Sequence, residues 1–513
     1  MEQRINAAAC LFETGAEHHI AVECGPQRVS YAELRQRVAR AAGAWQGMAL
    51  APDDRVVVFA PDSIEYVEAY LGVIWAGGAA IAVNPRLGMP ELSAILSESG
   101  AAFIWTTAEL APQLLALART LPQPITVVAS HGGDVDWHTA CATALPVAPL
   151  LRAADDVALW IGTSGTTGTP KGVMHTHSVT APAAAFAREI LGAGPQDRLY
   201  ATSKLFFAYA LANCLFAGLR LGATVILDSE WPTAERVAEM VKRHRPTILF
   251  CVPTLYHKIL QAGVAETLKE GGIRHFISAG ETLPSSVSSA WKKATGRAPI
   301  SCYGTSETLC LMLYCDDDSG RLMPTPLTQF RYDNLPPDLP QRVWVKHPAV
   351  ARGYWQRPIE QADGFRDGWF SPGDMFLRRE GWLEFTGRND DMLKIAGQWV
   401  STQWVEQALR AACGDTVQAL AAVGVKSAEG LTAIAAFLVA TPAQEAAARH
   451  SVAAGIAALP GHKRPRWVHW VDALPHTATG KLQRAGLGAL HRQHCEGEHC
   501  ERTPPAAKDP LPI

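Results

Sequence analysis

The stretch that decides the fold is Thr163-Ser-Gly-Thr-Thr-Gly-Thr-Pro-Lys-Gly-Val173. Its eleven positions hold five hydroxyl side chains, three glycines and one lysine. Glycines let backbone N–H groups turn inward on an anion, and the hydroxyls and the ammonium group add donors and positive charge. The segment therefore predicts a loop that binds phosphate. It is not a Walker loop, because that motif requires glycine where Pro170 stands.

The flanks of this segment support the same interpretation. The apolar run Val157–Ile161 precedes it, and a helical stretch is expected from about Ser178. Clusters of Ser, Thr and Gly are most often plain linkers. A buried strand that feeds a glycine-rich turn favours a nucleotide phosphate site instead.

Short apolar strands alternate with helical segments along the first part of the chain. The helix predicted over Tyr31–Trp45 has Ser30 as its N-cap, and a second helix is expected from Ser63 to Gly77. The predicted strands are Arg55–Ala60, Ala79–Val83, Ala223–Leu227, Thr247–Val252 and His275–Ala279. This alternation predicts an α/β fold with mainly parallel sheets, whose ligand sites lie beyond the carboxyl ends of the strands.

Bulk composition narrows the classes of partner. The chain has 513 residues, of which 48% are hydrophobic and 19% are charged, and its net charge is −3. This length predicts at least two domains, and the charge gives no indication of a nucleic acid or a membrane as partner. We expect the eleven cysteines to be reduced thiols, as in a cytoplasmic protein. Neither a signal peptide nor an apolar stretch of about 18 residues is evident.

A domain boundary is expected where polar, turn-prone residues follow the strand Trp382–Thr386. We predict an N-terminal domain over residues 1–389, a small α+β domain over 390–490, and a disordered tail over 491–513. In this tail, His494-Cys495 and His499-Cys500 could in principle hold a metal ion. Four such side chains without a surrounding fold are weak evidence for a metal site.

Four further motifs follow in order: Tyr303-Gly-Thr-Ser-Glu-Thr308, Ser371-Pro-Gly-Asp374, Gly387-Arg-Asn-Asp-Asp-Met-Leu-Lys394 and Pro475-His-Thr-Ala-Thr-Gly-Lys481. Together with the first segment they resemble the adenylate-forming superfamily of acyl-CoA synthetases, luciferases and adenylation domains. The resemblance extends from about residue 10 to 490. It implies a large N-terminal domain of mixed, mainly parallel sheets with a β-subdomain, followed by a small, mobile C-terminal α+β domain.

The resemblance also implies which residues bind the nucleotide. Tyr303 would stack on adenine, and the turn Ser278–Glu281 would lie on the other side of the nucleotide. Asp374 would bind the ribose hydroxyls and Arg388 the ribose and phosphate, although Pro372 stands where the family usually has threonine. The full predicted set is Thr163, Ser164, Gly165, Thr166, Thr167, Gly168, Gly280, Glu281, Tyr303, Gly304, Thr305, Asp374 and Arg388.

The implied chemistry begins with attack of a carboxylate on the α-phosphate of ATP, which needs charge neutralisation and alignment. Lys171 would hold the β- and γ-phosphates, and Ser306 would contact the α-phosphate. Glu307 would bind Mg²⁺, a hard cation that prefers oxygen ligands. Lys481 would stabilise charge that develops during adenylation.

The second half-reaction requires a different surface at the same adenylate. In the family, the small domain rotates about a hinge aspartate, which corresponds to Asp390. This rotation would withdraw Lys481 and present the segment around Gly397, where the missing side chain leaves room for a pantetheine arm.

The acid pocket resembles that of the benzoate- and hydroxybenzoate-CoA ligase branch. That branch carries a run similar to Phe206-Phe-Ala-Tyr209, although the same residues would also suit a core helix. It typically has Leu-His-Ile where this chain has Leu309-Cys310-Leu311, which favours a substituted benzoate. The predicted pocket residues are Phe207, Ala208, Tyr209, Ser278, Ala279, Cys310 and Leu311.

These features predict an ATP-dependent ligase that converts an aromatic acid to an aryl-adenylate and then to a CoA thioester, acting as a monomer or homodimer. An alternative acceptor is the phosphopantetheine of an acyl carrier protein. Two other classes are a non-catalytic nucleotide-binding relative and a luciferase-type oxidative enzyme. The presence of Lys171, Glu307, Asp374, Arg388 and Lys481 argues against the non-catalytic class.

Overall fold

The computed structural model describes residues 4–163, 171–317, 319–333, 335–388, 392–395, 398–427, 431–476, 482–496 and 501–502. The chain forms two compact units. The first contains Met1–Arg331 and Trp344–Pro372, and the second contains Tyr332–Val343 and Gly373–Ile513.

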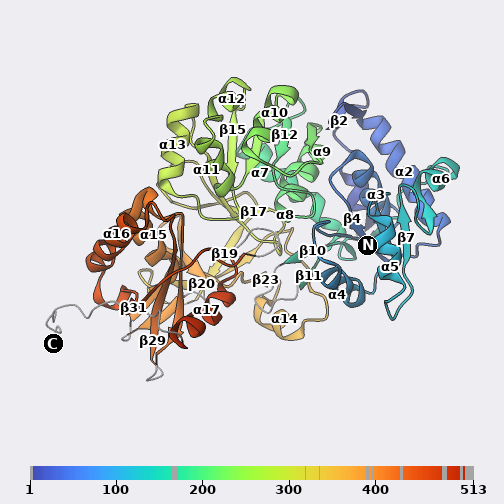
Figure 1. Ribbon diagram of the computed structural model, residues 1–513. Coiled ribbons are helices and arrows are strands. Elements are labelled where there is room, and N and C mark those ends of the chain that lie inside the picture. Colours follow the sequence, from blue (N-terminus) through green and yellow to red (C-terminus); the bar gives the residue numbers. More distant parts are fainter. Residues whose placement is uncertain are drawn as a thin grey trace. The chain divides into compact units, whose positions relative to one another are not determined.

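An eight-stranded sheet forms one layer of the first unit (Figure 1). In spatial order its strands are β21 (Gly353–Tyr354), β11 (Lys171–Thr176), β10 (Val157–Thr163), β5 (Ala79–Ala82), β4 (Arg55–Phe59), β6 (Phe103–Thr106), β7 (Thr126–Ala129) and β8 (Val135–Asp136). The strands from β10 to β8 pair in parallel, whereas β11 pairs antiparallel with both β10 and β21.

A nine-stranded sheet forms the second large layer of this unit. In spatial order its strands are β18 (Met323–Pro324), β17 (Leu311–Cys315), β16 (Ile300–Gly304), β15 (His275–Ser278), β14 (Ile248–Cys251), β12 (Arg198–Ala201), β13 (Thr224–Leu227), β2 (Ile20–Cys24) and β3 (Gln27–Ser30). The strands from β16 to β2 are parallel, and antiparallel strands stand at both edges.

Successive side chains along a strand point to opposite faces of its sheet and so pack into two different cores. On β4, Val56 and Val58 belong to the core between the two sheets, where α2 (Tyr31–Gly47) and α3 (Ile64–Trp75) also pack. Val57 and Phe59 face the other way, toward α4 (Met89–Ser99) and α5 (Ala111–Ala118). This division follows from the two-residue period of a strand.

A further helical layer covers the outer face of the nine-stranded sheet (Figure 1). It consists of α10 (Ala234–His244), α11 (Pro253–Gln261), α12 (Ala265–Glu270) and α13 (Ser285–Thr295). The remaining helices of the first unit are α1 (Ala7–Cys10), α6 (Trp137–Thr143), η1 (His177–Thr180), η2 (Pro182–Ala184), α7 (Ala185–Glu189), α8 (Ala208–Ala210), the π-helix η3 (Leu211–Phe216), α9 (Ala217–Leu221) and α14 (Pro358–Gly364). A short ladder joins β1 (Arg4–Ile5) to β9 (Arg152–Ala153).

The predicted α/β architecture with mainly parallel sheets is confirmed. The side chain of Ser30 accepts a hydrogen bond from the backbone N–H of Glu33, so it caps α2 as expected. One local expectation needs correction. The strand β11 stands between the glycine-rich segment and the helical turns near Ser178, so this segment connects two antiparallel strands. This hairpin was not among the elements predicted from the sequence.

The chain passes from one unit to the other three times: after Arg331, after Val343 within β20 (Gln341–Lys346), and after Pro372. In the first unit, Val345 of β20 pairs with Phe370 of β23 (Trp369–Phe370), which also pairs with β22 (Phe365–Arg366). In the second unit, the start of β20 pairs with β24 (Asp374–Arg378), which pairs with β25 (Leu383–Arg388). The strand β19 (Gln329–Tyr332) also pairs with β20.

The second unit also contains a four-stranded sheet with helices. Its strands are β28 (Ala419–Lys426), β29 (Thr432–Val439), β30 (Trp467–Trp470) and β31 (Glu501–Arg502), and a separate ladder pairs β26 (Met392–Ile395) with β27 (Gln398–Ser401). Its helices are α15 (Thr402–Cys413), η5 (Gly414–Thr416), α16 (Glu445–Ala458), η6 (Gly461–Lys463) and α17 (Arg484–Glu496).

Helix α17 continues to Glu496, so residues 491–496 are helical, although they were predicted to belong to a disordered tail over 491–513. Leu487 on this helix is fully buried in a core that includes Trp467 and Phe437 of the sheet. This apolar packing stabilises the helix against the sheet. Among the described residues, none of the helices combines the length and apolar character needed to cross a bilayer.

Gly43 in α2 lies close to a neighbouring segment, so substituting it tests the packing of the first unit. A Cβ added at Gly43 would lie 2.2 Å from the carbonyl oxygen of Leu145. The backbone hydrogen bond from Val147 to Ala39 holds this neighbouring segment in place. Gly43→Ala should therefore lower the free energy of unfolding by about 1–3 kcal/mol, the usual cost of overpacking. Urea denaturation followed by circular dichroism measures this change.

Gly47→Ala is the matched control in the same helix, since a Cβ there meets nothing within 4 Å. It should leave stability unchanged or raise it by up to about 1 kcal/mol, because alanine favours helix more than glycine does. Equal effects of the two substitutions would contradict the close approach at Gly43.

Candidate active site

The glycine-rich segment connects β10 and β11 at the end of their hairpin. Thr163 and Lys171 are register partners in this antiparallel pair. The predicted residues Ser164, Gly165, Thr166, Thr167 and Gly168 lie outside the described residues. The pairing brings Thr163 and Lys171 together where the chain leaves and re-enters the sheet.

Lys171 lies beside two residues that the sequence analysis missed. Its Nζ is 3.8 Å from Glu360 Oε1, a carboxylate on α14. It also lies 5.3 Å from the ring centroid of Tyr354, which stands on β21 next to β11. The Tyr354 hydroxyl donates a hydrogen bond of 2.7 Å to Glu307 Oε1. Tyr354 therefore connects the predicted phosphate-binding lysine with the predicted magnesium ligand.

The loop after β16 is held by backbone and side-chain hydrogen bonds. The Thr305 carbonyl accepts hydrogen bonds from the N–H groups of Thr308 and Leu309. The Thr308 hydroxyl lies 3.0 Å from the carbonyl oxygen of Cys310. At Gly304, an added Cβ would lie 3.1 Å from the same carbonyl oxygen, so a larger residue would crowd the turn. This explains physically why glycine occupies the position between Tyr303 and Thr305.

Two further hydrogen bonds attach this loop to the neighbouring sheet. His175 on β11 places Nε2 2.8 Å from the carbonyl oxygen of Ser306, and the backbone N–H of Ala351 donates to the carbonyl of Glu307 at 2.7 Å. Burial lowers the pKa of His175 to about 4, so its ring is neutral near pH 7. A carbonyl only accepts, and Nε2 of His175 therefore carries the proton.

The predicted turn after β15 lies at the carboxyl edge of the nine-stranded sheet. β15 and β16 are adjacent parallel strands, and they end at Ser278 and Gly304. Ser278 and Ala279 are buried, whereas Gly280 and Glu281 are exposed. The Thr254 hydroxyl donates to Glu281 Oε2 at 2.7 Å. The structure thus places the predicted adenine-side segments on neighbouring strands.

The predicted acid-pocket residues belong to the core between the two sheets. Ala208, Cys310 and Leu311 are buried there, and Phe207 and Tyr209 pack against it. The Tyr209 hydroxyl donates to the carbonyl of Ile277 at 3.1 Å, which places this side chain directly before Ser278. Burial raises the pKa of the Cys310 thiol to about 12, so it remains a neutral, largely apolar group.

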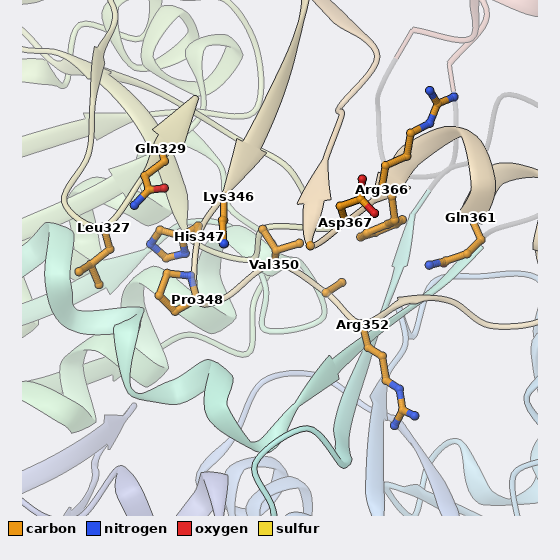
Figure 2. Close-up of a pocket in the computed structure, with 13 residues that line it drawn as sticks. Leu327, Gln329, Lys346, His347, Pro348, Val350, Arg352, Gln361, Arg366 and Asp367 are labelled. Carbon is orange, nitrogen blue, oxygen red and sulfur yellow. The ribbon is translucent and has the colours of Figure 1, made fainter. Parts of the chain in front are cut away.

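A cavity of about 690 Å³ also lies in the first unit (Figure 2). Its lining residues are Leu327, Gln329, Lys346, His347, Pro348, Val350, Ala351, Arg352, Gln361, Phe365, Arg366, Asp367 and Gly368. None of them was predicted as a site residue. In Figure 2 the Arg366 side chain points toward the top of the view and the Arg352 side chain toward the bottom, so the two guanidinium groups point away from each other.

In the second unit, two predicted ribose-binding positions are paired. Asp374 begins β24 and is the register partner of Arg388 at the end of β25. Asp374 is buried, and the preceding Gly373 has a φ of 75°, a conformation that glycine adopts without strain. The structure thus places Asp374 at the start of a strand, directly after Pro372 and Gly373. The predicted residues Asp390, Gly397 and Lys481 lie outside the described residues.

Known proteins resemble this chain over nearly its full length. The family model for AMP-binding enzymes matches residues 12–355. The 3-hydroxybenzoate–CoA ligase of Aromatoleum sp. (strain CIB) is 37% identical, covering 92% of this chain and 93% of the relative. The 3-hydroxybenzoate–CoA/4-hydroxybenzoate–CoA ligase of Thauera aromatica is 35% identical, with coverages of 92% and 94%.

Similarity to solved structures agrees with these sequence matches. The crystal structure of an anthranilate CoA ligase in complex with anthranoyl-AMP superposes with a TM-score of 0.87 at 25% identity. The alignment covers 97% of this chain and 99% of that one. Because the family model, the two relatives and the similarity in fold agree, the chain belongs to the AMP-binding enzyme family.

Proposed function

We propose that this protein activates a hydroxybenzoate with ATP and transfers the resulting aroyl group to CoA. The hydrogen bond from Tyr354 to Glu307, beside Lys171, supports this proposal most directly. It joins the loop after β16 to the strand next to β11, on which Lys171 lies. Relatives named as hydroxybenzoate–CoA ligases, at 35–37% identity over most of the chain, support the substrate class.

The proposed reaction has two balanced steps. In the first, a carboxylate oxygen of the aryl acid bonds to the α-phosphorus of ATP, and the bond to the pyrophosphate leaving group breaks. In the second, the sulfur of CoA bonds to the acyl carbon, AMP leaves, and the thiol proton passes to solvent. Both steps depend on positioning and on stabilisation of negative charge.

The side chains of the first unit suit the first step. Lys171 supplies a positive charge for the phosphates of ATP at the start of β11. Glu307 accepts a hydrogen bond at Oε1, and its second oxygen remains available for Mg²⁺, which prefers carboxylate and phosphate oxygens. Ser306 contacts the α-phosphate, and Tyr303 stacks on adenine.

The identity of the acid depends on the pocket near the carboxyl edge of the nine-stranded sheet. Phe207, Ala208 and Tyr209 line one side of the aryl ring, and Cys310 and Leu311 line another. A neutral thiol at Cys310 is smaller than the imidazole usual in the benzoate branch, which leaves room for a ring hydroxyl. We therefore assign 3-hydroxybenzoate as the first substrate to test.

Motion of a C-terminal domain beyond residue 389 separates the two steps. Asp390 acts as the hinge, Lys481 serves adenylation, and Gly397 admits the pantetheine arm. Asp374 and Arg388 bind the ribose. We place the enzyme in the cytoplasm as a monomer or homodimer.

A substrate panel tests the proposed function. Purified protein should catalyse pyrophosphate exchange with 3-hydroxybenzoate at a higher kcat/KM than with benzoate, 2-aminobenzoate or a fatty acid. Aryl-CoA should form, as measured by liquid chromatography, with no other protein present. Cys310→Ala should change the preference among ring substituents by about 10-fold or more, as for other changes in pocket volume.

Cys302→Ala is the control for the pocket residue, because this buried cysteine lies on β16 and is not among the predicted pocket residues. Exchange with none of the acids would favour a non-catalytic relative. Exchange without aryl-CoA formation would favour an acyl carrier protein as acceptor. Preference for a fatty acid would contradict the aryl pocket.

A second prediction concerns Tyr354 as a positioning residue for Glu307. Tyr354→Phe removes the hydrogen bond to Glu307 Oε1 and should raise the KM for Mg-ATP by about 10-fold. This factor is the lower end for a hydrogen bond to a charged group, about 1.5–3 kcal/mol. The KM for the aryl acid should change little, and more Mg²⁺ should be needed for half-maximal activity. Steady-state kinetics at varied Mg²⁺ measures both effects.

Two further variants distinguish a positioning role of Tyr354 from a general structural role. Tyr314→Phe on β17 removes a hydroxyl elsewhere in the same unit and should leave the KM for Mg-ATP unchanged. In a Glu307→Gln background, Tyr354→Phe should have little further effect, because the two residues act through one interaction. Additive losses in the double variant would show that Tyr354 acts independently of Glu307.

A third prediction separates the two half-reactions. Lys481→Ala should lower the rate of adenylation by about 10² or more, as expected for the loss of one charge contact in the transition state. Conversion of pre-formed aryl-AMP to aryl-CoA should remain near normal. Single-turnover assays of each half-reaction measure the two rates. Gly397→Leu should do the reverse, and equal loss in both steps for Lys481→Ala would refute the proposed division.

A further inference from the structure

A cluster of imidazole and thiol side chains lies within the second unit, and the proposed reaction does not use it. His469 stands on β30, and His491 and Cys495 stand on α17. His491 and Cys495 are four residues apart on a helix, so they lie on the same face. The fold thus brings part of the histidine- and cysteine-rich C-terminal sequence against a histidine that is distant in the chain.

The candidate ligand atoms of this cluster converge. His469 Nε2 lies 2.9 Å from His491 Nδ1, and Cys495 Sγ lies 3.7 Å from each ring nitrogen of His491. The three ligand atoms all fall within 4.8 Å of one another. A tetrahedral zinc ion with bonds of about 2.0–2.3 Å holds its ligand atoms roughly 3.3–3.8 Å apart. Such an ion requires the two imidazole nitrogens, now 2.9 Å apart, to move slightly apart and the exposed Cys495 side chain to adjust.

The burial and the chemistry of the cluster fit a zinc ion. His469 is 1% exposed and His491 is 6% exposed. Two buried imidazoles beside a cysteine that is not in a disulfide are a common ligand set for zinc.

We propose that His469, His491 and Cys495 bind one zinc ion, with water as the fourth ligand. Imidazole nitrogen and thiolate sulfur favour zinc over magnesium or calcium, which prefer oxygen. On binding, a zinc–sulfur bond forms, the Cys495 S–H bond breaks, and the proton passes to solvent. Because the ligands come from β30 and α17, the ion fastens the C-terminal helix to the four-stranded sheet. The exposed position of Cys495 leaves a route for the ion to enter from solvent.

Metal binding to the full-length chain, prepared without a histidine tag and stripped by a chelator, tests this proposal. Titration calorimetry with Zn²⁺ should show one equivalent bound per chain. Co²⁺ at the same site should produce a thiolate-to-cobalt charge-transfer band in the near ultraviolet. Zn²⁺ should also raise the midpoint of thermal unfolding, because an ion that binds only the folded state stabilises it.

Cys495→Ser and His491→Gln should each lower zinc affinity by at least about 10- to 100-fold, the range observed when even an outer partner of a metal ligand is removed. Cys495→Ser should also abolish the charge-transfer band. Cys141→Ser and His450→Gln are matched controls outside the cluster, and they should bind zinc like the unaltered chain. Absence of stoichiometric binding, or binding that Cys495→Ser leaves unchanged, would overturn the proposal. Because these readouts do not depend on ligase activity, failure of the proposed function would not affect them.

Discussion

The candidate active site depends on hydrogen bonds that attach the loop after β16 to the neighbouring sheet. His175, Ala351 and Tyr354 each contact this loop, at Ser306 or Glu307. The two large sheets of the first unit are otherwise joined through an apolar core. Apolar contacts are non-directional, whereas hydrogen bonds specify the positions of individual oxygen atoms. These polar contacts therefore determine where the Glu307 carboxylate lies relative to Lys171.

The neutral state of His175 is part of this constraint. Burial keeps its ring uncharged near pH 7, and a neutral ring can donate to the Ser306 carbonyl without bringing a charge into the core. A charged side chain at this position would require a buried counter-ion. The loop thus gains a directional contact from a residue that carries no charge and that lies on β11, next to the glycine-rich segment.

The two halves of the proposed chemistry place different demands on the molecule. The adenylation step needs fixed charges, which strands and short turns of the first unit supply. The transfer step needs space for a thiol, which the proposed domain motion supplies. A zinc ion between α17 and β30 would suit this arrangement, because a small domain that moves as one body benefits from an additional internal connection. The ion would fasten that unit internally without taking part in the ligase reaction.

Local patterns in the sequence determined much of the fold and the chemical class. The alternation of strands and helices, the Ser30 cap and the order of five motifs depend on neighbouring residues, and these features indicated an adenylate-forming α/β protein. The hairpin of β10 and β11 was missed, because polar residues interrupt the apolar pattern of β11. Helix α17 was not predicted, because the burial of Leu487 depends on a distant sheet.

The tertiary structure alone decided which residues meet. Tyr354 and Glu360 contact Glu307 and Lys171 across long stretches of chain, and no local pattern marks them as site residues. His469 likewise reaches His491 only through the packing of β30 against α17. Sequence motifs record the chemistry that a segment can perform, because side-chain type is local. The pairing of these groups depends on sheet order and helix packing, which only the folded chain establishes.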